Sequence, residues 1–170
     1  DFWESLEGMS LQLNDAVAVG PRSGFGEIPV VGDDGDDAGI RTARGGVVIS
    51  PTDFNPERIL LDDTLFATPT VNVGDGFTTP VRGVLDYSFG NFKLNLTQAL
   101  TRVDNGLSRE VTTAPAAGEL AVATFNVENL SPNDPQSKFD TLADQVVDRL
   151  LSPDVIALED FYRDNGYLNA

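Results

Sequence analysis

Short apolar runs separated by turn residues fill the first two thirds of the chain. The runs are "SLQLNDAVAVG", "FGEIPVV", "GGVVIS", "ERILLDD", "PVRGVLDYSF" and "NFKLNLTQ". Between them lie segments such as "GDDGDDAG" and "VNVGDGF", whose Gly, Asp and Asn residues favour turns. No long helical period interrupts this pattern. Residues 1–111 are therefore predicted to form an all-β domain, a small sandwich or barrel.

The clearest turn lies within "DYSFGNFKL", where Gly90 and Asn91 are predicted to be the tight-turn residues of a β-hairpin. Three aromatic residues flank this turn: Tyr87 and Phe89 before it and Phe92 after it. Two interpretations stay open for them. They pack in the core, or they form a platform on which single-stranded bases stack.

The pattern changes after "TTAPAAGE", residues 112–119, which is predicted to be a linker. "LAVATFNVENL" predicts a strand over 120–130, and "DVIALED" predicts a second strand over 154–160. Between them, apolar residues recur at steps of three and four in "SKFDTLADQVVDRLLSPD", as on one face of a helix. A strand, a helix and a strand in this order predict two parallel strands.

The ends of the predicted helix carry their own signals. Ser137 and Asp140 have the spacing of a capping box, with Asp in place of Glu. Pro153 follows the last apolar residues and is predicted to end the helix.

Polar residues interrupt both predicted strands near their carboxyl ends. Asn126 and Glu128 belong to the first strand, and Glu159 and Asp160 to the second. Ligands of parallel sheets collect at that edge, and carboxylates with an amide suit a hard cation such as Mg²⁺. The alternative is that the acids are solvated at strand ends beside an Asn that caps a turn.

Composition excludes several kinds of chemistry. The 170 residues contain 27 acidic and 11 basic side chains, a net charge of −16, which disfavours nonspecific binding to a phosphate backbone. Cysteine and histidine are both absent, which removes disulfides, thiolate chemistry, histidine metal ligands and the Ser-His-Asp triad. No apolar run reaches the length of about 18 residues that a membrane span needs. The acidic run at residues 33–37 is either a solvated hairpin or a Ca²⁺ loop without the usual spacing.

The chain also resembles a known family. "LAVATFNVENLSP", "KFDTLADQVVDRLLSPDVIALED" and the later "DNG" resemble the opening of the endonuclease/exonuclease/phosphatase superfamily, which has the deoxyribonuclease-I-like fold. "LEGMSLQLNDAVAV", "FGEIPV" and "VNVGDGFTTPVRGVLDYSFGNFKL" are similar to the OB-fold-like domain of large secreted bacterial nucleases in that group. The resemblance implies an OB-like small barrel over residues 1–111 and the opening βαβ unit of an α/β (α+β) sandwich over 120–170. It also implies a bacterial, extracellular or cell-surface protein.

The resemblance implies roles for four residues. Asn126 matches the asparagine that contacts the scissile phosphate, and Glu128 matches an acidic position near the metal. The metal-binding glutamate falls on Asp160, one methylene shorter, with Glu159 before it. The implied cofactor is Mg²⁺ or Mn²⁺, or else Ca²⁺, and the implied substrate is a nucleic acid bound by the complete parent domain.

The later Asp, Asn and His residues of that family have no counterpart before Ala170. The resemblance therefore implies a truncated, incomplete catalytic domain that has no nuclease turnover by itself. Two alternatives place the function in residues 1–111: a noncatalytic module that binds nucleic acid, sugar or a neighbouring domain, or a structural spacer.

Overall fold

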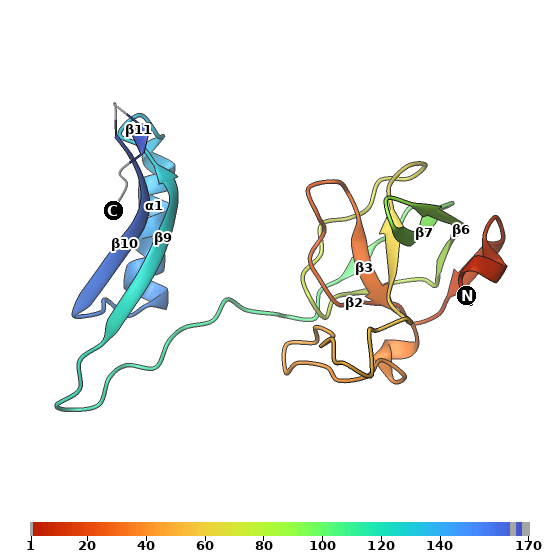
Figure 1. The fold of residues 1–170 in the computed structure, drawn as a ribbon, viewed down its shortest axis with the longest axis horizontal. Helices are drawn as coiled ribbons and strands as arrows, with labels where there is room; N and C mark the ends of the chain where they lie inside the picture. Colours follow the sequence, from red (N-terminus) through yellow and green to blue (C-terminus); the bar gives the residue numbers. More distant parts are fainter. Residues whose placement is uncertain (1, 164–165, 168–170) are drawn as a thin grey trace. The chain divides into compact units, whose positions relative to one another are not determined.

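A computed structural model describes residues 2–163 and 166–167, and the chain divides into two compact units (Figure 1). Unit 1 comprises residues 1–107 and unit 2 comprises residues 108–170. Both units are built mainly from β-strands, and the longest helical segment among the described residues covers residues 136–149. Among those residues, no helix has the length and apolar character needed to cross a bilayer.

Unit 1 is centred on one mixed sheet of six strands in the order β1-β6-β7-β4-β3-β2. The strands are β1 (Ser10–Leu13), β2 (Val17–Ala18), β3 (Ile28–Val31), β4 (Ile59–Asp62), β6 (Val81–Ser88) and β7 (Asn91–Leu96). Neighbours are antiparallel except β4 and β7, which are parallel. β1 and β2 lie at opposite ends of the sheet although only residues 14–16 separate them. No closed barrel is detected among the described strands.

Smaller elements complete unit 1. Strands β5 (Gly76–Phe77) and β8 (Arg102–Val103) form an antiparallel pair. Two short 3-10 helices, η1 (Glu4–Leu6) and η2 (Asp33–Gly35), lie in the connections. The strand predicted over "GGVVIS" is wrong, because that segment has only isolated bridges at Val47 and Ser50. Its apolar residues have no neighbouring strand to pair with, and Ile49 is 64% exposed.

The hairpin between β6 and β7 exists, but its turn differs from the prediction by one residue. Ser88 pairs with Asn91, so Phe89 and Gly90 form the two-residue turn. Both have left-handed backbones, with φ of 49° and 77°. A two-residue turn of this kind needs positive φ at both central positions, and glycine meets that need while phenylalanine does so with strain.

Side chains of the six-stranded sheet form most of the core of unit 1. Its buried apolar side chains come from β2, β3, β4, β6 and β7 and include the fully buried Ile28, Ile59, Leu61, Leu85 and Leu94. The partly buried Trp3 and Phe92 pack against this cluster. Continuous apolar runs such as "RILLD" therefore become strands that are buried on both faces.

Unit 2 contains the predicted strand, helix and strand. Its elements are β9 (Val122–Leu130), α1 (Gln136–Asp144), a π-helical turn η3 (Gln145–Arg149), β10 (Val155–Arg163) and β11 (Gly166–Tyr167). The prediction that the two strands are parallel is confirmed for β9 and β10, while β11 pairs antiparallel with β10. The predicted capping box is wrong, because α1 begins at Gln136 after Pro135 and has no side-chain cap. Ser137 lies inside the first turn and so cannot be the capping residue.

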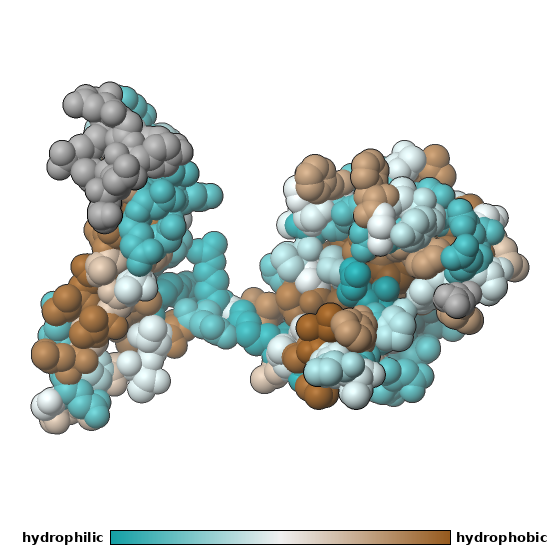
Figure 2. Space-filling model, viewed as in Figure 1, coloured by the Kyte–Doolittle hydropathy of each residue, from teal (hydrophilic) through white to brown (hydrophobic). Residues whose placement is uncertain are grey.

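The apolar faces of unit 2 are only partly covered. Phe125 and Val127 of β9 and Phe139 of α1 line a cavity of about 190 Å³ between the helix and the strands. On the other face, Val122 and Val155 pair in register and are 72% and 54% exposed. Figure 2 shows hydrophobic residues gathered on the surface of this unit. Val127 is the one buried residue among positions 108–161.

Candidate functional site

The parallel pairing of β9 and β10 places Asn126 directly beside Glu159. The two residues are partners in the strand register, and both are exposed. Paired residues of neighbouring parallel strands point to the same face and lie about 4.8 Å apart along the hydrogen-bonding direction. The side-chain amide of Asn126 and the carboxylate of Glu159 therefore share one face of the sheet, near the carboxyl ends of both strands.

The backbone departs from regular strand geometry just beyond this pair. Glu128 and Asp160 have left-handed backbones, with φ of 51° and 71°, and the register of β10 shifts between Glu159 and Phe161. Such bulges redirect side chains and are frequent beside active sites. The Glu128 amide donates a hydrogen bond of 2.8 Å to Oδ1 of Asn126. That bond fixes the orientation of the Asn126 amide group.

Lys138 of α1 ties the helix to the same strand end. Its Nζ donates a hydrogen bond of 2.8 Å to the carbonyl oxygen of Glu128 and forms an ion pair of 3.0 Å with Asp134. The connection between β9 and α1 is thereby held beside Asn126 and Glu128.

The predicted metal ligands are Glu128, Glu159 and Asp160, and all three are exposed at this edge. Their role stays a prediction. Within residues 2–163 and 166–167, no three Asp or Glu side chains lie close enough together to hold a metal ion. The same holds for the acidic run at residues 33–37, part of which forms the short helix η2.

The three aromatic residues of the hairpin have different surroundings. Phe92 is half-buried and packs against the core, which agrees with the alternative that these aromatic residues are core residues. Tyr87 is 51% exposed and Phe89, at the turn, is 95% exposed. The rings of Tyr87 and Phe92 lie 4.8 Å apart, and Nζ of Lys93 lies 5.2 Å from the centre of the Phe89 ring. The hairpin thus presents aromatic surface beside one cation.

Lys93 is buried, and sequence reasoning gave it no role. It hydrogen-bonds Glu27 of the β3 region and lies 3.4 Å from Asp62 at the end of β4. The bond to Glu27 outweighs burial and, with the contribution of Asp62, raises the pKa of Lys93. Burial would raise the pKa of Asp62, but hydrogen bonds from Thr64 and the charge of Lys93 outweigh it and lower that pKa.

A second buried carboxylate, Asp75, also lacks a sequence signal. Its side chain is fully buried and accepts hydrogen bonds from the backbone amides of Asn72 and Asn105. Its Oδ2 atom also lies 2.6 Å from Nε of Arg102. Burial alone would raise the pKa of Asp75, but these donors and the guanidinium outweigh it and lower the pKa. The single signal in the sequence is the turn string "NVGDG", which is typical of any loop.

Comparisons with known proteins inform unit 1 alone. No curated protein and no solved structure matches the chain significantly. Residues 1–105 match the family described as a domain of unknown function, DUF8508. This match ends two residues before the end of unit 1. Because it covers more than half of the 170 residues, the chain belongs to the DUF8508 family.

Proposed function

We propose that unit 2 contributes phosphate-binding and metal-binding groups to a divalent-metal-dependent nuclease or phosphodiesterase. The observation that carries this proposal is the parallel register of β9 and β10, which sets Asn126 beside Glu159. The strained residues Glu128 and Asp160 at the same edge support it. Strain of this kind concentrates at functional sites.

The donor groups at this edge fit a hard cation. Carboxylate and amide oxygens are the ligands that Mg²⁺ and Mn²⁺ prefer, and Asp160, Glu159 and Glu128 would hold the ion directly or through water. A divalent ion bound there supplies Lewis-acid stabilisation of negative charge on a phosphoryl oxygen. The Oδ1 atom of Asn126 accepts the hydrogen bond from the Glu128 amide. The Nδ2 group takes no part in that bond and would donate to a phosphate oxygen.

For unit 1, we propose an OB-like arrangement of the sheet. β1 and β2 read as one bent strand, because they lie at the two ends of the sheet and only residues 14–16 intervene. The parallel pairing of β4 with β7 within an otherwise antiparallel sheet supports this assignment. In this arrangement the bent first strand bridges both edges of the sheet.

The 170-residue chain is expected to show no nuclease turnover. It contains no histidine, which is the commonest general base for activating water. The measurement is cleavage of supercoiled plasmid in Mg²⁺ or Mn²⁺, with the chelator EDTA as the control. Metal-dependent cleavage by this chain alone would show that its own acids suffice, and the expectation of no turnover would be wrong.

Binding of metal can be tested separately from turnover by paramagnetic NMR. We expect Mn²⁺ to broaden the amide signals of residues 126–129 and 158–161 before those of other acidic segments. Asp160→Asn and Glu159→Gln should each raise the Mn²⁺ concentration needed for broadening about tenfold, since each removes a charged oxygen ligand.

Asp148→Asn is the matched control for these variants, since it removes one exposed carboxylate from the helical segment of the same unit. It should leave the Mn²⁺ response unchanged. Broadening that follows the acidic residues at 33–37 instead, or an equal effect of Asp148→Asn, would contradict the assignment.

A second candidate function rests on the aromatic hairpin of unit 1. The exposed rings of Tyr87 and Phe89 are features of platforms on which single-stranded bases stack. In this function unit 1 binds single-stranded nucleic acid without catalysis. The high net negative charge implies that such binding is weak and decreases with salt.

Phe89→Asn separates this function from a purely structural role. Asparagine tolerates the left-handed backbone that Phe89 adopts, so we expect the free energy of unfolding to rise by about 1 kcal/mol. If the hairpin binds single strands, the same variant should weaken the binding of labelled oligothymidine, measured by fluorescence anisotropy, about fivefold or more. Wild-type chain that binds no oligonucleotide, with or without Ca²⁺, would favour the spacer interpretation.

A further inference from the structure

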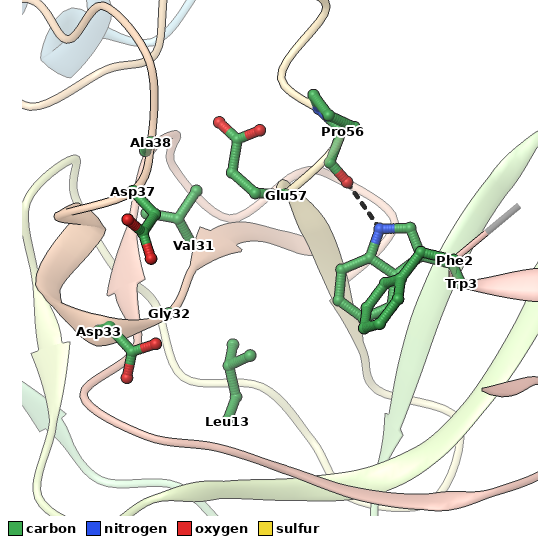
Figure 3. Close-up of a pocket in the computed structure, with 10 residues that line it drawn as sticks. All are labelled: Phe2, Trp3, Leu13, Val31, Gly32, Asp33, Asp37, Ala38, Pro56 and Glu57. Carbon is green, nitrogen blue, oxygen red and sulfur yellow. Dashed lines mark hydrogen bonds between the residues drawn. The ribbon is translucent and has the colours of Figure 1, made fainter.

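A pocket on unit 1 is lined by four separate segments and combines aromatic with acidic side chains. It has a volume of about 520 Å³, which is within the usual size range of small-molecule sites. Figure 3 shows the rings of Phe2 and Trp3 on one side, the carboxylates of Asp33 and Asp37 on the other, and Glu57 between them. The lining shares no residue with the edge of β9 and β10 or with the aromatic hairpin.

The aromatic side of the pocket is held in place by contacts within unit 1. The Trp3 indole N–H donates a hydrogen bond of 2.6 Å to the carbonyl oxygen of Pro56. Phe2 lies edge-on to Trp3, with 5.1 Å between the ring centres. Leu13 and the buried Val31 complete the apolar lining. The Trp3 ring is therefore anchored to the loop at Pro56, and Phe2 packs on it.

Among the described residues that line the pocket, none carries a positive charge to balance the acidic side. Asp33, Asp37 and Glu57 are the charged residues of the lining, and no Lys or Arg belongs to it. The Oε1 atom of Glu57 is buried and has no hydrogen-bond partner among the described residues. Three carboxylates without a basic residue in the described lining favour a positively charged ligand.

The kind of cation follows from the spacing and from the lining. No three acidic side chains among the described residues are close enough to enclose a metal ion, and most of the other lining residues are apolar rather than further oxygen ligands. Aromatic rings attract organic cations and also cover an apolar stem. We propose that this pocket binds an organic cation, an alkylammonium group on an apolar stem, either free or as the lysine side chain of a peptide.

Trp3 provides a direct reporter, because it is the one tryptophan of the chain and lines the pocket. The probes for the full chain are n-butylammonium, its uncharged counterpart n-butanol, and a blocked Gly-Lys-Gly tripeptide. Trp3 fluorescence and titration calorimetry together record binding. We expect saturable binding of the ammonium probe or the peptide, weaker at high salt, and no saturable binding of butanol. Tighter binding of butylammonium would indicate a free alkylammonium ligand, and tighter binding of the tripeptide would indicate the lysine side chain of a peptide.

Two variants and one control complete the experiment. Glu57→Gln and Asp33→Asn should each lower the affinity about tenfold or more, since each removes a charged hydrogen-bond acceptor. Asp86→Asn, which changes the net charge equally at an exposed residue of β6 outside the pocket, should leave the affinity unchanged. The use of two separate acids covers the case in which one variant does not fold, as checked by circular dichroism.

Three results would overturn the proposal. These are the absence of heat and of fluorescence change with both cationic probes, saturable binding of butanol as strong as that of butylammonium, and an equal loss of affinity in Asp86→Asn. None of these results bears on Mn²⁺ binding at Asp160, so the two proposals fail independently.

Discussion

Replacing Asp75 with asparagine is expected to lower the free energy of unfolding of unit 1 by about 3 kcal/mol, near the lower limit for breaking a buried ion pair. Asp75 is fully buried, and its two oxygens serve the amides of Asn72 and Asn105 as well as Arg102. The variant leaves these donors facing a neutral amide. Arg102 is 28% exposed, so water relieves part of the loss. Urea denaturation followed by Trp3 fluorescence measures the change.

Asp104→Asn is the matched control for this prediction. Asp104 pairs with the same guanidinium at 3.0 Å, but its side chain is 65% exposed. Exposed ion pairs contribute about 1 kcal/mol or less, so this variant should unfold almost like wild type. Equal losses in the two variants would show that the pairing of Arg102, rather than the burial of Asp75, controls the stability.

The same buried carboxylates determine how the stability of unit 1 depends on pH. The folded state lowers the pKa of Asp75 and of Asp62 below their ordinary value of 3.8. A lowered pKa contributes stability that is complete above the unfolded value and is lost as pH falls through the folded value. Unit 1 should therefore lose stability below about pH 4, and Asp75→Asn should show a shallower acid dependence than wild type. Identical slopes would contradict the role assigned to Asp75.

Amide hydrogens of β9 and β10 in unit 2 are expected to exchange with solvent at least about 100-fold faster than those of β4, β6 and β7 in unit 1, after correction for intrinsic rates. Val127 is the one buried residue among positions 108–161, whereas unit 1 contains an extended core. Few buried apolar contacts mean a small free energy of local opening. Hydrogen-deuterium exchange followed by NMR resolves the two units in one sample.

The Asp75→Asn variant also serves as a control for this second prediction. It should accelerate exchange in unit 1 and leave the rates of β9 and β10 unchanged, because Asp75 has no partner among the residues of unit 2 for which contacts are described. Equal protection of both units in wild type would mean that the exposed Val122 and Val155 are covered in solution. The expectation of a weakly stable unit 2 would then be wrong.

Much of the secondary structure could be predicted because it depends on local patterns. The alternation in residues 120–130 predicts β9, and the apolar steps after Ser137 predict the helix. The misses have local causes as well. "GGVVIS" has strand propensity but no neighbouring strand, and the hairpin turn falls on Phe89 and Gly90 because the register pairs Ser88 with Asn91. Propensity gives no information about which strand is available for pairing.

The candidate sites differ in how visible they are in the sequence. The edge that holds Asn126 and Glu159 could be predicted, since two short strands of known direction bring their ends together. The pairing of Lys93 with Glu27 spans 66 residues, and Trp3 reaches Pro56 across 53 residues. Such contacts depend on the strand order of the sheet, which alternation alone does not specify. The acidic pocket beside Trp3 was missed for that reason.

The pairing partners of β1 and β2 have a consequence for folding kinetics. β1 pairs with β6, so that Gln12 lies opposite Arg82, while β2 pairs with the nearby β3. Residues close together in sequence thus belong to one local and one very distant pairing, and the parallel contact of β4 with β7 is also distant. Chains dominated by distant pairings fold slowly, on the order of milliseconds to seconds. Until β1 pairs, the edge of β6 that faces away from β7 stays open, and a second copy of the chain can add a strand there.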